Sequence, residues 1–233
     1  MPSWSIHLAM AKKLNKKLKL DKDLFFFGNL IPDINYGNKL TRKDTHFNKT
    51  FKCKNCPSET LPDINEFLKS YSNKLKDPLI LGYYTHLLTD YYFNNYVFTK
   101  CWVQNDKNKV VGIKLKNGKI IKTDNNDKTL RKDYKHYDFE LYGRNLFKSG
   151  IIEVPKLSEN IEKSLKLLKD NFFTVELAKK RIDYLNTDFN KFNKISLKEK
   201  IFGYKLFYKE ELDRIFDNCY KYIIKELKNN IKE

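Results

Sequence analysis

The chain has 233 residues, which is long enough to bury a proper core and within the usual size of one domain. It carries 46 lysine and arginine residues against 29 acidic ones, a formal net charge of +17, but the lysines are scattered along the sequence. Four cysteines are too few for a disulfide scaffold, and we expect Cys53 and Cys56 to be free thiols in a loop. Composition therefore predicts a single domain over residues 1–233 and allows an anionic partner, either a membrane surface or a nucleic acid.

Targeting and membrane signals are not visible in the sequence. The first residues lack the charged segment and the following apolar segment of a secretory signal peptide. No apolar run approaches the length of a membrane span, and the mean hydropathy is −0.66. We therefore expect a cytoplasmic protein without a transmembrane segment.

Helical periodicity of the apolar residues runs through most of the chain. The predicted helices cover, in order, residues 5–18, 62–75, 79–101, 126–148, 158–171, 174–185 and 196–228. Pro32 is expected to stop any helix and to hold Asp33 on a turn, and residues 35–61 are expected to form a long polar loop. Asn117-Gly118, set between alternating residues, predicts one β-hairpin. The predicted fold class is therefore all-α, a multi-helix domain with a small β-hairpin insertion near residues 109–122.

The predicted helix over residues 79–101 is apolar nearly all round and carries His86 and Asp90 four residues apart. This spacing places the imidazole and the carboxylate on one helical face. An ionised carboxylate among apolar neighbours is costly unless a charged partner or a metal ion offsets its desolvation. Two readings stay open at this point: a metal-binding pair, or a His–Asp hydrogen bond in a structural helix.

The other three histidines also stand near carboxylates in the sequence. His7 and His46 lie on either side of Asp33, and His136 is followed one helical turn later by Glu140. Mixed imidazole and carboxylate ligands are typical of zinc and, less specifically, of manganese or iron. Each of these residues taken singly also fits an ordinary surface, turn or helix-face position, so the spacing alone leaves a metal site as one of two hypotheses.

Four segments, in this order, resemble the motifs of the zinc-dependent phospholipase C family, whose superfamily includes single-strand nucleases. They are Trp4-Ser-Ile-His7, Phe27-Gly-Asn-Leu-Ile-Pro-Asp33, Thr45-His46-Phe47 and Gly82-Tyr-Tyr-Thr-His86-Leu-Leu-Thr-Asp90. The resemblance spans roughly residues 3–148 and implies a helical domain with metal ions in a cleft. We therefore expect the metal-site part at about residues 1–148 and additional C-terminal helices at about residues 156–230.

The resemblance implies two to three zinc ions and seven metal ligands. The implied ligands are Asp33, His46, His86 and Asp90 on one ion, Asp90 with His7 and the terminal amino group on a second, and His136 with Glu140 on a third. The chain departs from the family at two points. Trp4 is internal, whereas family enzymes expose a terminal tryptophan. Asn94 and Asn95 stand where the family has a further histidine, and Asp133 is a geometric candidate for its place.

The resemblance implies a hydrolase, a zinc-dependent phosphodiesterase of the phospholipase C type. Metal-activated hydroxide would attack a phosphodiester, and Asp33 would orient the water or accept its proton. The expected partner is a phosphoester substrate, with phospholipids among the candidates. Three alternatives stay open: a nuclease-type phosphodiesterase of the same superfamily, a non-catalytic helical binding protein that retains a structural metal, and a charge-driven module for membranes or nucleic acids.

Overall fold

A computed structural model describes residues 2–34, 41–53, 56–107, 109–124, 128–169, 173–191 and 203–231. Most of these residues are helical, and the only strands among them form two small antiparallel sheets, which confirms the predicted fold class. The helices are α1 (Trp4–Leu18), α2 (Lys22–Gly28), α3 (Arg42–His46), α4 (Ile64–Tyr71), α5 (Pro78–Cys101), α6 (Lys128–Lys148), α7 (Ile161–Leu165), α8 (Val175–Lys191) and α10 (Lys209–Asn230). Two short 3₁₀ helices cover Ile31–Asp33 and Ser72–Lys74.

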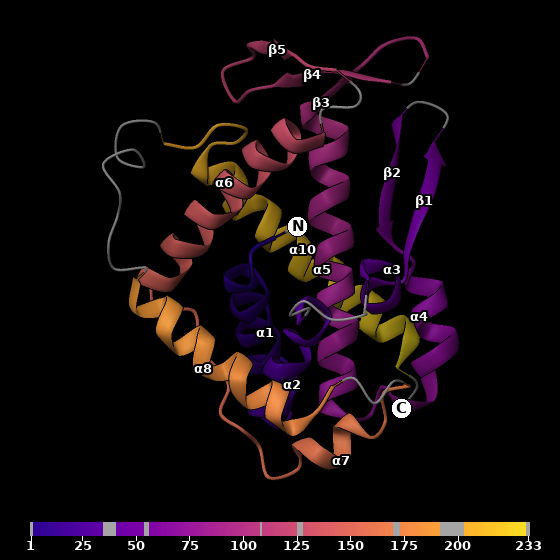
Figure 1. The fold of residues 1–233 in the computed structure, drawn as a ribbon, viewed down its shortest axis with the longest axis vertical. Helices are drawn as coiled ribbons and strands as arrows, with labels where there is room; N and C mark the ends of the chain where they lie inside the picture. Colours follow the sequence, from indigo (N-terminus) through magenta and orange to yellow (C-terminus); the bar gives the residue numbers. More distant parts are fainter. Residues whose placement is uncertain are drawn as a thin grey trace.

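The long helix α5 runs through the middle of the molecule, and the other helices are arranged around it (Figure 1). It begins where the side chain of Asp77 accepts hydrogen bonds from the backbone N–H groups of Leu79 and Ile80, with Pro78 at the first helical position. Nearly every side chain of its first four turns is buried. The prediction of a central helix over residues 79–101 is therefore confirmed.

The helices α2 and α5 are in direct backbone contact at two glycines. A Cβ atom on Gly28 would lie 2.1 Å from the carbonyl oxygen of Leu79, and one on Gly82 would lie 2.2 Å from the carbonyl oxygen of Phe25. No side chain larger than hydrogen fits at either position. This close approach brings Asn29, the residue that follows α2, against the middle of α5.

The segment predicted as a long polar loop, residues 35–61, contains regular structure. A capping box formed by Thr41 and Asp44 starts the helix α3, and the strands β1 (Asn48–Cys53) and β2 (Cys56–Pro62) then form an antiparallel hairpin. The loop prediction was therefore wrong for residues 42–53 and 56–61, because the hairpin shows little of the apolar alternation that marks a strand. Residues 35–40 and the side chains of Cys53 and Cys56 lie outside the described part of the chain.

The predicted hairpin near residues 109–122 is confirmed and gains a third strand. The strands β3 (Trp102–Gln104), β4 (Val110–Lys114) and β5 (Ile120–Lys122) pair antiparallel in that order. Gly118 takes a positive φ of 83° in the turn between β4 and β5, a conformation that glycine adopts without strain. This sheet lies beyond the C-terminal end of α5, away from the middle of the molecule (Figure 1).

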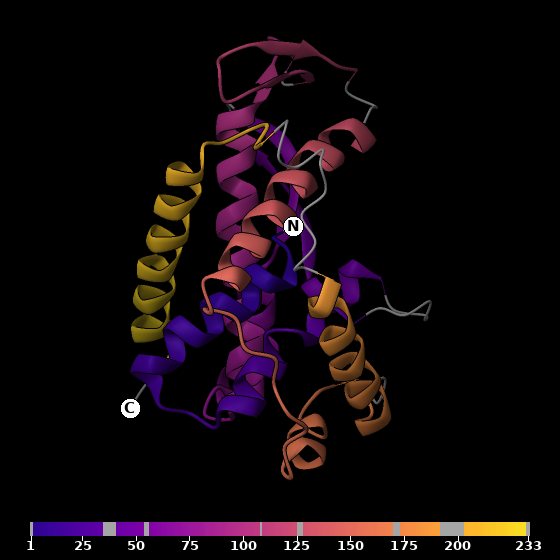
Figure 2. The same cartoon turned by 90° about the vertical axis from the view of Figure 1, so that its left-hand side faces the viewer.

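The C-terminal helices differ most from the prediction. Residues 158–169, the described part of the helix predicted over residues 158–171, contain only the short helix α7, and α8 extends beyond residue 185. Of the helix predicted over residues 196–228, residues 196–202 lie outside the described part, residues 203–208 are not helical, and α10 covers Lys209–Asn230. The helix α10 packs along α5 (Figure 2). No helix in the described ranges is both long enough and apolar enough to cross a membrane.

A buried carboxylate binds the backbone of the segment that precedes α10 in the sequence. Asp138 on α6 accepts hydrogen bonds from the backbone N–H groups of Lys205, Leu206 and Phe207, at 2.6, 2.7 and 3.0 Å. Its side chain is completely buried, and burial raises its pKa to about 6 despite these three donors. Asp138 therefore joins α6 to the segment that positions the last helix.

We predict that Gly82→Ala destabilises the protein by about 2 to 4 kcal/mol, since the added methyl group must push α2 away from α5. Urea denaturation followed by circular dichroism measures the change. Asn95→Ala, at an exposed position of the same helix, is the control and should change the stability by less than about 0.5 kcal/mol. Equal stabilities of Gly82→Ala and the wild type would show that the two helices do not need this contact.

We also predict a pH-dependent stability difference between the wild type and Asp138→Asn. The folded pKa of Asp138, about 6, lies above its unfolded value of 3.8, so protonation favours the folded state and this contribution is lost as the pH rises through about 6. The stability of the wild type relative to the variant should therefore fall by roughly 2 kcal/mol between pH 4 and pH 7. Urea denaturation of both proteins across this range checks the slope, and a flat difference would contradict it.

Candidate metal centre

Five of the seven residues predicted as metal ligands lie together in one buried place. They come from α1 (His7), the 3₁₀ helix after α2 (Asp33), α3 (His46) and α5 (His86 and Asp90). Four of the five side chains are completely buried, and that of Asp33 is 12% exposed. Four elements that are separate in the sequence thus contribute donor atoms to one centre.

Asp33, His46 and His86 form a first donor group. The Nε2 atom of His46 lies 3.3 Å from Oδ1 of Asp33 and 3.3 Å from Nε2 of His86. The Nε2 atom of His86 lies 4.0 Å from Oδ2 of Asp33. One ligand atom of each residue is within 4.8 Å of the other two, which is close enough for all three to bind one ion.

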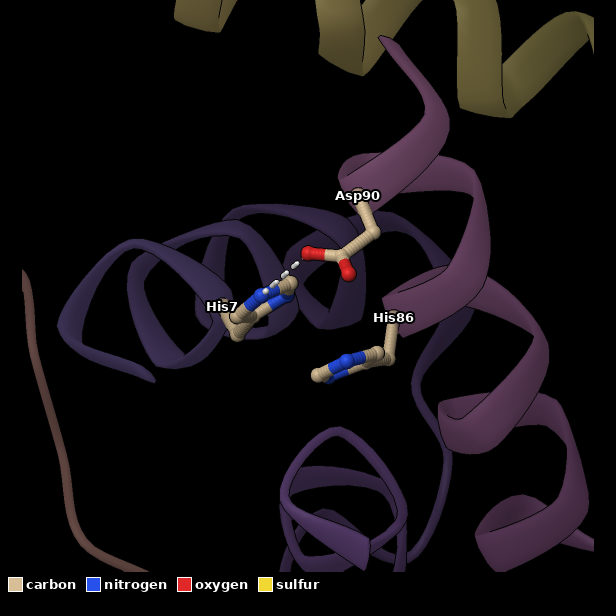
Figure 3. Close-up of side chains that lie close together, drawn as sticks. All are labelled: His7, His86 and Asp90. Atoms are coloured by element: carbon tan, nitrogen blue, oxygen red, sulfur yellow. Dashed lines mark ion pairs between the residues drawn. The ribbon is translucent and has the colours of Figure 1, made fainter. Parts of the chain in front are cut away.

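His7, His86 and Asp90 form a second donor group, drawn in Figure 3. The Nε2 atom of His7 lies 3.3 Å from Oδ1 of Asp90, and the rings of His7 and His86 stack with their centroids 3.8 Å apart. His86 belongs to both groups, and the other carboxylate oxygen of Asp90 lies 3.6 Å from Nε2 of His46. The two groups are therefore neighbours that share His86 of α5.

Hydrogen bonds behind the histidines orient their rings. Nδ1 of His86 lies 2.8 Å from the carbonyl oxygen of Asn29, an atom that can only accept, so Nδ1 carries the proton. The neutral ring then has its lone pair on Nε2, which points into the centre. The side chain of Asn29 is itself held, because it accepts from the hydroxyl of Thr85 and donates to the carbonyl of Phe25. The contact between Gly28 and Gly82 therefore supports the orientation of His86.

His46 is oriented in a similar way by its neighbour in the chain. Its Nδ1 atom lies 2.9 Å from the hydroxyl oxygen of Thr45, whose hydroxyl group points to the carbonyl oxygen of Thr41. We assign Nδ1 as the donor on this basis, which again leaves Nε2 with a lone pair. The Nε2 atoms of His46 and His86 and the oxygens of Asp33 and Asp90 are then all acceptors, and they converge on the same space.

Burial keeps the imidazoles of His46 and His86 neutral, which is the form that binds a metal. It lowers the pKa of His86 to about 3, and it also lowers the pKa of His46 despite the nearby carboxylates. Burial alone would raise the pKa of Asp90, but His7, His86 and Arg42 outweigh it and hold that pKa well below its ordinary value. The pKa of Asp33 is lowered in the same way by its contacts with His46 and His86. The centre thus combines neutral nitrogen donors with ionised carboxylates.

Arg42, the first residue of α3, connects the two carboxylates. Its Nη1 atom lies 3.3 Å from Oδ1 of Asp33, and its Nη2 atom donates to Oδ2 of Asp90 at 2.9 Å. The side chain is 39% exposed and reaches the buried centre from the solvent side. Arg42 is therefore the permanently charged cation at this centre in the described part of the chain.

A cleft of about 310 Å³ opens in front of the centre. Side chains from five elements line it, among them Trp4, Asp33, Arg42, His136, Glu140 and Arg181. The guanidinium of Arg181 on α8 stacks over the ring of Trp4, 4.7 Å from its centroid. Asp33 of the centre and the cations Arg42 and Arg181 thus face one space that is large enough for a small phosphoester.

His136 and Glu140, the remaining predicted ligands, line this cleft but do not join either donor group. Burial lowers the pKa of His136 to about 4 and raises the pKa of Glu140. Among the described residues, no third set of three donors lies within reach of one ion. Asp133, considered as a stand-in for a missing histidine, is exposed and is not among the residues that line the cleft.

Several buried nitrogen and oxygen atoms of the centre have no hydrogen-bond partner within the part of the chain that the structure describes. They are both ring nitrogens of His7 and Oδ1 of Asp90, because the 3.3 Å approach of these two residues is not aligned as a hydrogen bond. A buried polar atom left without a partner costs about 1 to 3 kcal/mol. Imidazole nitrogen combined with carboxylate oxygen is a donor set typical of zinc. The residues of the centre therefore fit a zinc ion.

Three supporting residues, Asn29, Arg42 and Thr45, were not predicted from the sequence. Asn29 and Thr45 lie inside the motifs quoted above but carry no metal-binding signal of their own. Arg42 had a detectable signal, because it stands four residues before His46 and directly after the capping residue Thr41, which places it on the same face of a short helix. Its contact with Asp90, 48 positions later, follows only from the tertiary structure.

Comparison with known proteins agrees with this geometry. A family model described as zinc dependent phospholipase C matches residues 4–199, a range that includes all five residues of the centre as well as His136 and Glu140. No curated protein and no solved structure matches the chain. Because the family match covers most of its length, the chain belongs to the zinc-dependent phospholipase C family, a family of metal-dependent phosphoester hydrolases.

Proposed function

We propose that this protein is a zinc-dependent phosphodiesterase of the phospholipase C type, with His7, Asp33, His46, His86 and Asp90 as its metal ligands. One observation carries the proposal: five nitrogen and oxygen donors from four elements converge in a buried centre that opens into a cleft. A structural metal site is usually closed, whereas a catalytic one keeps a position open to substrate. The cleft in front of Asp33 favours the catalytic role over the binding-protein alternative.

We propose two zinc ions at the paired donor groups. Asp90 is the bridging ligand in this assignment, because one carboxylate oxygen faces His7 while the other faces His46. A third ion at His136 and Glu140 stays a prediction. These two residues line the same cleft, and the low pKa of His136 keeps it neutral and able to bind a metal.

Bound zinc supplies a Lewis acid that polarises a phosphoryl oxygen and lowers the pKa of water toward neutrality. The residues of the chain supply position and proton transfer. Asp33 is ionised and lies at the boundary between the buried centre and the cleft, so it is the proposed residue that orients the attacking water and accepts its proton. His46 and His86, held by Thr45 and Asn29, cannot turn away from the centre without losing a buried hydrogen bond.

We propose a phosphodiester as the substrate, and the family favours the headgroup phosphodiester of a phospholipid. The cations Arg42 and Arg181 in the cleft suit the anionic phosphate. A nuclease-type phosphodiesterase of the same superfamily is the second candidate, since Trp4 in the cleft offers a ring on which a base could stack. A single domain and a cytoplasmic location stay predictions.

The proposal predicts two to three zinc ions per chain in protein purified without an N-terminal tag, since the amino end of the chain lies close to the cleft at Pro2. Plasma mass spectrometry measures the metal content, and hydrolysis of bis-p-nitrophenyl phosphate before and after chelation measures activity. Turnover should disappear with the chelator and return with zinc. One tightly bound zinc without turnover would instead support a structural metal in a binding protein.

The bridging role predicts that Asp90→Asn loses most of its zinc and at least about 10³-fold in turnover, because the substitution removes the negative charge that lies between His7 of one donor group and His46 of the other. Metal content, turnover and thermal stability are measured on the same preparation. His136→Ala is the matched comparison, because it alters the same cleft outside both donor groups and should retain at least the first ion. Unchanged zinc content in Asp90→Asn would rule out the bridging assignment.

A further inference from the structure

The guanidinium of Arg42 supplies positive charge to the two carboxylates of the centre. It contacts Oδ1 of Asp33 and Oδ2 of Asp90, one oxygen from each of the two carboxylates. These same two oxygens are the ones nearest to Nε2 of His46, at 3.3 and 3.6 Å. Arg42 therefore donates to the oxygen atoms that, together with the histidine nitrogen, form the metal-binding surface.

Zinc and Arg42 compete for these oxygens. Zinc binds carboxylate oxygen at about 2.0 to 2.2 Å and compensates its negative charge. A guanidinium beside the same oxygens is then no longer stabilised by them. Arg42 in turn offsets the desolvation of Asp90, which is completely buried and would otherwise have to be protonated or carry an unbalanced charge. Each cation thus stabilises the carboxylates in the absence of the other.

We propose that Arg42 has two positions: in the metal-free protein it substitutes for zinc between Asp33 and Asp90, and in the zinc-loaded protein it turns into the cleft and binds a phosphoryl oxygen of the substrate. The first half of this inference rests on contacts in the structure. The second half rests also on the proposed function, because it needs a phosphoester in the cleft.

The structure permits the movement. Arg42 begins a short helix, its side chain is 39% exposed, and it already lines the cleft in front of the centre. Rotation of the side chain toward the cleft needs no rearrangement of the buried core. A planar guanidinium presents paired N–H donors that match a phosphate as well as a carboxylate, so the same group serves both positions.

If zinc displaces Arg42 from the carboxylates, one substitution should lower the stability of the metal-free protein and raise its affinity for zinc. In Arg42→Ala, metal-free protein should melt roughly 5 to 10 °C below the wild type, because two carboxylates lose their cation. The same variant should bind zinc about tenfold more tightly, because no internal cation has to be displaced. Differential scanning calorimetry after chelation measures the first quantity, and competition for zinc with a chromophoric chelator measures the second.

Lys43→Ala is the control for this pair of measurements. It removes one positive charge from the same helix at an exposed position, so a general effect of charge would appear in both variants. We expect Lys43→Ala to match the wild type in melting temperature and in zinc affinity. Zinc affinity in Arg42→Ala that equals or falls below that of the wild type would overturn the exchange, since a merely structural arginine would lower stability and metal affinity together.

The second position is tested with inorganic phosphate. In zinc-loaded protein, phosphate should inhibit the hydrolysis of bis-p-nitrophenyl phosphate about tenfold less strongly in Arg42→Ala than in the wild type, with partial recovery in Arg42→Lys. An unchanged inhibition constant would overturn the phosphate-binding role. Failure of the proposed function is a separate outcome: the wild type would bind zinc without hydrolysing phosphodiesters, while the zinc affinities would still report on the exchange.

Discussion

The charge balance of two carboxylates in a buried centre is the constraint on which the rest of this structure depends. Asp90 lies in the interior of the central helix, and Asp33 lies at the edge of the same centre. A carboxylate in such surroundings is stable only beside a cation or a set of hydrogen-bond donors. The neutral rings of His46 and His86 beside the two carboxylates offer lone pairs instead of charge. The two carboxylates therefore depend on a cation for their charge balance, and Arg42 contacts one oxygen of each in this structure.

A close backbone contact makes this arrangement possible. The two glycines at which α2 crosses α5 allow the carbonyl of Asn29 to reach the ring of His86, which directs the lone pair of Nε2 toward His46 and Asp33. Orientation of a ligand by a second layer of hydrogen bonds is a general requirement of metal sites. Here the second layer includes the carbonyl group of Asn29, the residue that follows α2. The packing of α2 against α5 and the orientation of His86 therefore depend on the same close contact.

The sequence predicted the structure well where all the residues that determine an element lie within that element. The central helix was predictable because its cap, its proline and its continuous apolar character are all local, and His86 and Asp90 share a face through the helical period alone. The hairpin over residues 48–62 was not predictable, since its strands are polar and their pairing consists of backbone hydrogen bonds. The non-helical segment before Lys209 was also missed, because its backbone N–H groups donate to a distant carboxylate, Asp138, which holds the segment out of a helix.

The sequence by itself determined the type of donor atoms, their order along the chain, the helical pair on α5 and, through the motifs, the family. Only the tertiary structure decided which donors meet. It brings His7, Asp33 and His46 to that pair, leaves His136 and Glu140 on the wall of the cleft, and adds Arg42, whose contact with Asp90 spans 48 positions. The physical reason is that a helix has a fixed period, so it sets distances within itself. Distances between elements are set by packing and by close backbone contacts, which no local spacing encodes.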